Sequence, residues 1–177
     1  MELSRIQRTI GITTLMVTHD QAEALALSDR VVVMNAGRIE QDGLPLDAYE
    51  NPATGFVCDF LGKANRFPID RLDGATVQIG PLSVALPAGL APQLRTGARV
   101  LVRPEKIAFG PPGPAALDAT VSNRVFQGNH WLYQFDTPLG PVLVIRQNDG
   151  GLQPATGESV HLVWRATDMR AVPGDST

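Results

Sequence analysis

Apolar residues in the first part of the chain follow two different periods. Within residues 2–10 they recur at helical spacing, which predicts an amphipathic helix ended by Gly11. Residues 13–17 join two β-branched threonines to three apolar residues, and this composition predicts a buried strand of a parallel sheet. Helical spacing then returns from about residue 19 to residue 28. The order helix, strand, helix is typical of an α/β protein.

Residues 29–62 continue with short elements. The apolar run 31–34 and residues 38–41 flank the turn sequence Asn35-Ala36-Gly37, which predicts a β-hairpin. Two short helices are predicted at 45–50 and 54–61, because prolines and glycines interrupt the pattern around them.

From about residue 63 the helical period stops, and short apolar runs alternate with Gly and Pro. A spacing of about 8 to 12 residues with turn signals between runs predicts an all-β sandwich or barrel. The predicted strands are 75–79, 82–86, 99–103, 119–125, 131–136, 141–146 and 159–165.

His19 is the candidate site residue. Thr18 and Gln21 have the spacing of a capping box, which would make Thr18 the N-cap and place His19 and Asp20 in the first helical turn. Asp20 is explained there by the helix dipole. His19 follows the carboxyl end of the predicted strand, which is where ligands bind in open α/β sheets.

Composition narrows the classes of function. The chain has 177 residues, 44% of them hydrophobic, with a net charge of −3 and one cysteine. A single cysteine excludes an internal disulfide. The negative charge and the 6% aromatic content argue against a binder of single-stranded nucleic acid, which needs a basic groove with stacking platforms. No apolar run approaches the ~18 residues of a membrane span, so any membrane contact is expected to pass through a partner.

The motif Thr18-His19-Asp20-Gln21-Ala22-Glu23-Ala24 is followed by Ser28-Asp29-Arg30-Val31 and by Met34-Asn35-Ala36-Gly37-Arg38-Ile39. This ordered series closely resembles the end of the P-loop ATPase domain of ABC transporters. The resemblance implies that His19 is the switch histidine of the H-loop, which contacts the γ-phosphate of ATP and helps to position the attacking water. ATP and Mg²⁺ are the cofactors of that family.

Other motifs of that family do not occur in this sequence. It contains no G-x-x-x-x-G-K-[ST] phosphate loop, no L-S-G-G-Q signature and no apolar strand ending in Asp-Glu. Because the family carries them upstream of the H-loop, the chain is expected to be the C-terminal part of a longer protein. We therefore expect it to bind neither ATP nor a metal by itself and to be incompetent for hydrolysis alone.

The second part of the chain resembles the TOBE domain of importer ATPases. Val102-Arg103-Pro104-Glu105-Lys106-Ile107 carries this likeness, with supporting runs at 126–131 and 157–164 and a junction at 60–65. The expected fold is thus an α/β fragment over residues 1–62 followed by an all-β OB-like barrel over residues 63–177. The junction is more similar to importers of sulfate, polyamines, iron and phosphonates than to sugar importers.

The resemblance implies partners and a location. It implies a second ATPase subunit in a homodimer, transmembrane permease subunits, and a cytoplasmic position on the inner face of the membrane. Nucleic acid is not an expected partner. The alternative function is a non-catalytic dimerisation or small-ligand-sensing module.

Three further groups of residues have plain structural interpretations. Arg103-Pro104-Glu105 is expected to end a strand with its charges solvated. His130 and His161 lack partners at metal-ligand spacing and are expected on strand surfaces. Trp131 and Tyr133 should share one face of a strand.

Overall fold

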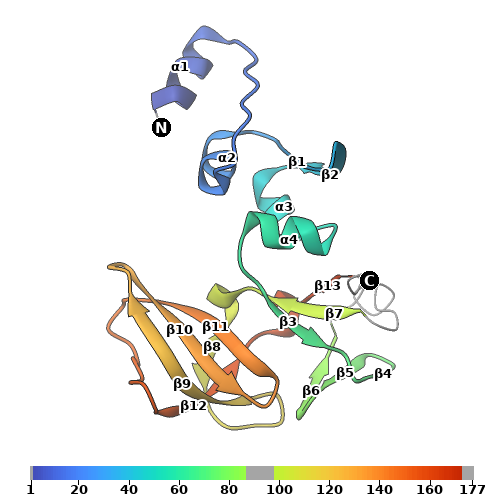
Figure 1. The fold of residues 1–177 in the computed structure, drawn as a ribbon, viewed down its shortest axis with the longest axis vertical. Helices are drawn as coiled ribbons and strands as arrows, with labels where there is room; N and C mark the ends of the chain where they lie inside the picture. Colours follow the sequence, from blue (N-terminus) through green and yellow to red (C-terminus); the bar gives the residue numbers. More distant parts are fainter. Residues whose placement is uncertain (1, 87–97, 173–177) are drawn as a thin grey trace. The chain divides into compact units, whose positions relative to one another are not determined.

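The computed structural model describes residues 2–86 and 98–172. The chain divides into two compact units, residues 1–63 and residues 64–177, and each has a hydrophobic core of its own. The first unit carries the α-helices and the second is built from strands (Figure 1). The α-helices are α1 (Glu2–Ile10), α2 (Gln21–Leu27), α3 (Pro45–Glu50) and α4 (Gly55–Leu61).

The hairpin predicted in the first unit is confirmed. Strands β1 (Val31–Asn35) and β2 (Arg38–Gly43) pair antiparallel around a two-residue turn. Ala36 has φ 47° and Gly37 has φ 77°, the positive values of a tight hairpin turn. Glycine adopts them freely, whereas the Cβ of Ala36 costs about 1 kcal/mol there.

The core of the first unit is small and one-sided. Val31 and Val33 of β1 are buried, while Val32 and Met34 between and after them are 51% and 58% exposed. This alternation follows from the period of a strand whose single covered face packs on helices. The remaining buried members of this core are Ala48, Val57 and Leu61.

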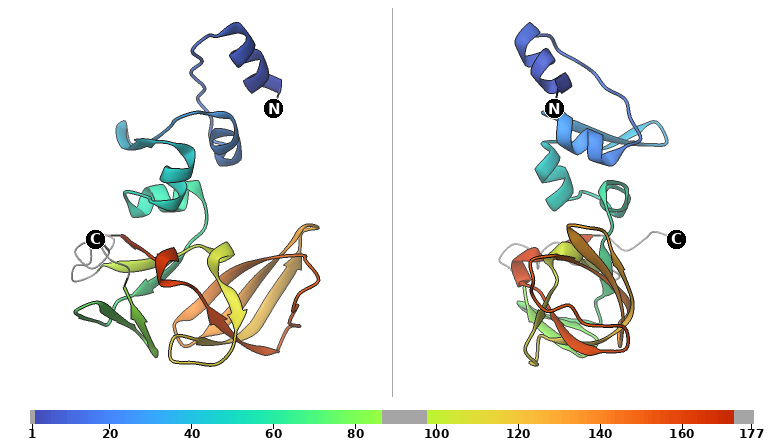
Figure 2. Two further views of the ribbon diagram at one scale, coloured as in Figure 1. Left: turned by 180° about the vertical axis from the view of Figure 1, so that it is seen from behind. Right: turned by 90° about the vertical axis from the view of Figure 1, so that its left-hand side faces the viewer.

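The described strands of the second unit form three antiparallel sheets. Strands β11, β10, β9, β12 and β8 form one sheet in that order, β13, β7 and β3 form another, and β4, β5 and β6 form a third. The five-stranded sheet curls around the core (Figure 2). The strands are β3 (Asn65–Pro68), β4 (Arg71–Asp73), β5 (Thr76–Ile79), β6 (Leu82–Ala85), β7 (Arg99–Val102), β8 (Ala108–Gly110), β9 (Leu117–Phe126), β10 (His130–Thr137), β11 (Gly140–Gln147), β12 (Ser159–Val163) and β13 (Arg170–Val172).

Strict alternation of side chains builds the core of this unit. Along β9, Leu117, Ala119 and Val121 are buried, while Asp118 and Thr120 are exposed. The pairing of β9 with β10 shifts register between Gln134 and Phe135. Such an irregularity bends a sheet and helps it to wrap around its own inner face.

The side chain of Asn65 joins two sheets of the second unit. Its Nδ2 donates to the carbonyl oxygen of Leu143 on β11 at 2.8 Å and to that of Val102 on β7 at 3.3 Å. Its Oδ1 accepts the N–H of Leu143 at 2.8 Å. Asn65 is 7% exposed, so these bonds satisfy backbone groups where the β11 edge meets β3 and β7.

All seven strands predicted after residue 63 are present as β5, β6, β7, β9, β10, β11 and β12. The sequence pattern does not predict β3, β4, β8 or β13, because runs of three or four residues are too short to show a period. None of the helices in the described part of the chain has the length and apolar character needed to cross a bilayer.

Candidate functional site

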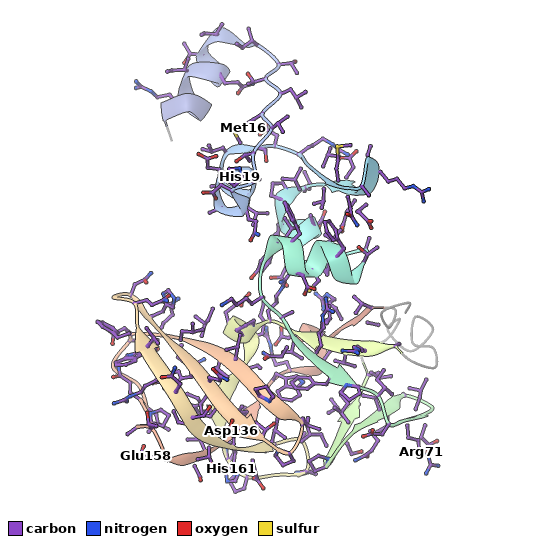
Figure 3. The ribbon with its side chains drawn as sticks, viewed as in Figure 1. Met16, His19, Arg71, Asp136, Glu158 and His161 are labelled. Carbon is purple, nitrogen blue, oxygen red and sulfur yellow. The ribbon has the colours of Figure 1, made fainter. Side chains whose placement is uncertain are left out.

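His19 lies just before α2, in the segment that connects α1 to α2 (Figure 3). The residue is exposed. Thr18 Oγ1 accepts the backbone N–H of Asp20 at 3.0 Å and donates to Glu23 Oε2 at 3.1 Å. Asp20 Oδ1 in turn accepts the N–H of Glu23 at 3.1 Å. The backbone N–H that follows His19 is therefore held by the side chain of the preceding Thr18, which is itself tied to Glu23.

The predicted capping box is wrong by two residues. The N-cap of α2 is Asp20, with φ −85° and ψ 110°, and the helix begins at Gln21. His19 thus precedes the helix instead of lying in its first turn. The physical reason is local: the short Asp20 side chain reaches the N–H three residues on and caps the helix itself. The capping-box spacing is instead shared by Asp20 and Glu23.

The strand predicted at residues 13–17 is also absent from the structure. This segment is irregular, and the side chains of Leu15 and Val17 are 90% and 92% exposed. A strand exists only where a neighbour supplies its ladder of hydrogen bonds. Among the described residues none pairs with this segment, so its apolar composition alone does not make it a strand.

The residues present fit a nucleotide only in part. An exposed imidazole can contact a phosphate oxygen, but the cradle of backbone N–H groups that a phosphate loop provides has no counterpart in this sequence. In residues 2–86 and 98–172 no group of three or more His, Cys, Asp or Glu side chains is placed to hold a metal ion.

Two open grooves on the described part of the second unit share residues of β12. The first has a volume of about 580 Å³ and the second about 490 Å³, and Ser159, Val160 and His161 line both. His161 Nδ1 lies 2.8 Å from Asp118 Oδ1, directly across from it in register. Figure 3 labels Asp136 and His161, which also line the first groove.

The pairing of His161 with Asp118 is not visible in the sequence. The two residues are 43 positions apart, and only strand register brings them together. No spacing motif signals it. His130, the other histidine of this unit, lies 2.7 Å through Nδ1 from Asn129 Oδ1. Both histidines are on strands and partly exposed, as expected.

Arg103 differs from the expectation of solvated charges. It is only 6% exposed, where β7 ends at Val102 and the chain turns into the short 3₁₀ helix η2 (Pro104–Lys106). At this turn η2 lies against β11. The strand does end before Pro104, as predicted.

The aromatic residues of β10 face the core, and Trp131 and Tyr133 share one face as expected. Tyr133 is fully buried, and its hydroxyl has no hydrogen-bond partner in the described part of the chain. Burial raises the pKa of this phenol. The Arg124 guanidinium partly opposes the rise in pKa, although the two groups do not meet in hydrogen-bonding geometry.

An ion pair fixes the segment after β12. Arg165 donates through Nε and Nη2 to both oxygens of Asp168 at 2.8 and 2.9 Å, across the 3₁₀ helix η3 (Ala166–Asp168). These hydrogen bonds lower the pKa of Asp168, against a smaller opposing effect of burial.

Comparisons with known proteins agree with this architecture. Residues 100–172 match the family model of the TOBE domain. The spermidine/putrescine import ATP-binding protein PotA of Acidothermus cellulolyticus is 40% identical over 183 residues, covering 93% of this chain and 46% of that protein. The sulfate/thiosulfate import ATP-binding protein CysA 2 of Chromobacterium violaceum is 38% identical, covering 99% of this chain and 50% of that protein.

A third relative is named for another solute. The Fe(3+) ions import ATP-binding protein FbpC 2 of Rhizobium meliloti is 42% identical over 154 residues, covering 77% of this chain and 38% of that protein. The chain spans about half the length of the curated relatives it matches. Among solved structures, the cytoplasmic molybdate-binding protein ModG is similar at 16% identity with a TM-score of 0.47, covering 63% of this chain and 95% of that chain.

Proposed function

Since this chain belongs to the ATP-binding subunits of ABC importers and corresponds to their C-terminal part with a TOBE domain, we propose that it supplies the switch histidine of the ATPase. Its fold class, a fragment with helices followed by an all-β TOBE domain, is the one expected from the sequence. The observation that carries the proposal is His19 itself, exposed within the motif Thr18 to Ala24 on a segment held by Thr18 and Asp20.

In this proposal His19 contributes positioning. The imidazole contacts the γ-phosphate of ATP and orients the attacking water, and ATP and Mg²⁺ are bound mainly by the part of the subunit that this chain does not span. Phosphoryl transfer depends on positioning and charge stabilisation, so a single well-placed imidazole matters to the rate. The chain alone lacks the phosphate loop and the catalytic carboxylate, and it does not hydrolyse ATP by itself.

The partners follow from the same proposal. Two ATPase subunits would form a homodimer, and transmembrane permease subunits would hold them at the inner face of the membrane. Relatives named for polyamines, sulfate and iron match this chain at 38 to 42% identity, so we assign no solute to it.

A His19→Ala substitution in the full-length subunit tests the catalytic assignment. ATP hydrolysis should be lost, while ATP binding persists because most contacts to the nucleotide lie elsewhere. Unchanged hydrolysis would show that His19 is not the switch histidine. In addition, the chain of 177 residues should neither bind nor turn over ATP. Turnover by this chain would refute its dependence on the rest of the subunit.

The second unit provides the alternative function, a non-catalytic dimerisation or small-ligand-sensing module. Exposed apolar residues favour an interface: Val125 and Phe126 on β9 are 45% and 51% exposed, and Leu152 is 68% exposed. Sedimentation of the chain over a range of concentrations tests it. A species that stays monomeric at the highest concentration would count against the homodimer.

A further inference from the structure

The hydrogen bonds around His19 form a closed ring, and the His19 side chain takes part in none of them. The ring runs from the Asp20 N–H to Thr18 Oγ1, from the Thr18 hydroxyl to Glu23 Oε2, and from the Glu23 N–H to Asp20 Oδ1. The peptide group that follows His19 is thus hydrogen-bonded, and the residue before it is tied to α2 through the Thr18 side chain, while the imidazole stays exposed.

This ring differs from an ordinary capping box. In a capping box, the glutamate at the third helical position bonds directly to the N–H of the N-cap residue. Here Asp20 is the N-cap and Glu23 is that glutamate, but the Thr18 hydroxyl is inserted between the Asp20 N–H and the Glu23 carboxylate. The insertion extends the fixed segment back by two residues, so that it includes His19.

Capping alone does not account for the Thr18 hydroxyl. Asp20 already satisfies the N–H of Glu23, which lies inside α2, and the backbone carbonyl of Asp20 accepts the N–H of Ala24 at 3.1 Å. The Thr18 hydroxyl bonds no N–H group inside the helix. What it adds is restraint of the irregular backbone that carries His19.

We propose that Thr18, acting through Glu23 and Asp20, is a positioning residue that sets the direction of the His19 imidazole. The inference rests on the proposed role of His19 as the phosphate-facing histidine. An exposed side chain on an irregular segment samples several directions unless its backbone is held, and a displacement of about 1 Å from the productive geometry can cost about 100-fold in rate. The ring of hydrogen bonds therefore reduces the entropic cost of placing the imidazole for the reaction.

The chain provides a matched control at the start of α4. Thr54 Oγ1 accepts the N–H of Val57 at 3.3 Å, and its hydroxyl donates to Glu40 Oε2 at 3.1 Å. The chemical groups are the same as at Thr18, in the same unit, but no histidine lies between them. Removing the Thr54 hydroxyl also removes a helix cap. A general loss of stability should thus follow from Thr54→Val at least as much as from Thr18→Val.

Steady-state ATP hydrolysis by the full-length subunit, reconstituted with its permease partners, tests the inference with four variants. For Thr18→Val and for Glu23→Ala, which breaks the same bond from its other end, kcat should fall about tenfold or more while the KM for ATP stays within about twofold. Thr18→Ser keeps the hydroxyl and should retain activity. Thr54→Val should leave kcat within about twofold of the parent.

The mobility of the imidazole gives a readout that does not depend on activity. The chain has three histidines, so NMR relaxation of each ring can be followed in the 177-residue chain. Thr18→Val and Glu23→Ala should lower the order of the His19 ring, whereas Thr54→Val should not. Parent-like kcat, or parent-like order of the His19 imidazole, in both of the first two variants would overturn the inference, as would an equal loss in Thr54→Val.

The two proposals fail in different ways. If His19→Ala abolishes hydrolysis but Thr18→Val and Glu23→Ala do not reduce it, the positioning inference is wrong and the catalytic assignment stands. If His19→Ala retains hydrolysis, the catalytic assignment is wrong. The positioning inference is then wrong as well, even if the His19 imidazole becomes more mobile in Thr18→Val and Glu23→Ala.

Discussion

Replacing Asn65 by leucine should lower the free energy of unfolding of the strand-rich unit by about 3 kcal/mol. The amide makes three hydrogen bonds, two with Leu143 at 2.8 Å and one with Val102 at 3.3 Å. A net value of about 1 kcal/mol for each bond gives that total. Domains of this size are stable by about 5 to 15 kcal/mol, so the loss is a large fraction of the whole.

The assay can observe this unit selectively. Trp131 and Trp164 are the two tryptophans of the chain, and both belong to residues 64–177. Urea unfolding followed by tryptophan fluorescence therefore reports on this unit alone. Asn65→Leu should shift the midpoint without changing the slope. In a thermal scan, about 3 kcal/mol corresponds to a loss of about 12 °C.

An aspartate at the same position separates the hydrogen bonds from the shape of the side chain. Asn65→Asp keeps the size and one acceptor but replaces the Nδ2 donor by an oxygen facing the Leu143 and Val102 carbonyls. Burial and these carbonyls raise the pKa of the introduced carboxyl in the folded state. The contribution of this carboxyl to folding stability is then most favourable at low pH and is lost as the pH rises through the raised pKa. Asn65→Asp should therefore be more destabilising at pH 7 than at pH 4.

The exposed Asn123 on β9 provides the control for Asn65→Leu. Asn123→Leu should change stability by less than about 0.5 kcal/mol, as most surface substitutions do. If Asn65→Leu costs no more than Asn123→Leu, or if Asn65→Asp shows no dependence on pH relative to the parent, the bridging role of the Asn65 amide is refuted.

The remaining predictions concern single sites. Tyr133→Phe removes a buried hydroxyl that has no hydrogen-bond partner among the described residues, so it should cost nothing at pH 7 in urea unfolding. Because the pKa of Tyr133 is raised in the folded state, the stability that its protonation contributes is fully present below about pH 10 and is lost as the pH rises through the raised pKa. The Tyr133→Phe variant should therefore lose less stability than the parent at alkaline pH. A large loss at pH 7 would show a hidden partner. Asp168→Asn removes a carboxylate whose pKa is lowered by Arg165, so stability should fall less steeply than in the parent as the pH drops below about 4; an unchanged acid limb would contradict this. Asparagine tolerates the positive φ of 47° at position 36, so Ala36→Asn should raise the free energy of opening of the hairpin, measured by amide exchange, by about 0.5 kcal/mol. Faster exchange in this variant would argue against the turn geometry.

The existence of a helix or strand follows from the sequence more reliably than the residue at which it begins or ends. The hairpin around Asn35-Ala36-Gly37 and helices α3 and α4 are where the pattern predicts them, since turn residues and short helical periods are local signals. The N-cap of α2 is not, because Thr18 and Asp20 both have capping side chains and both spacings occur in the sequence. Geometry decides between two such candidates, and the sequence alone does not.

At the candidate site, too, the sequence shows the motif and the structure shows its contacts. The motif containing His19 is visible in the sequence, and with it the family to which the relatives belong. The role of His19 stays a prediction. The contacts that hold its backbone, from Thr18 to Glu23, emerge only from the structure, because the motif does not show which hydroxyl meets which carboxylate.

By itself the sequence determined the order of a helix-containing part and an all-β part, the positions of the long strands and the motif around His19. These depend on residue type and on spacing within a few positions. Only the tertiary structure decided that residues 13–17 are not a strand, that Asn65 meets Leu143 across 78 positions, and that His161 pairs with Asp118. The physical reason is that strand formation and register depend on hydrogen bonds to a distant neighbour, and a sequence pattern does not name that neighbour.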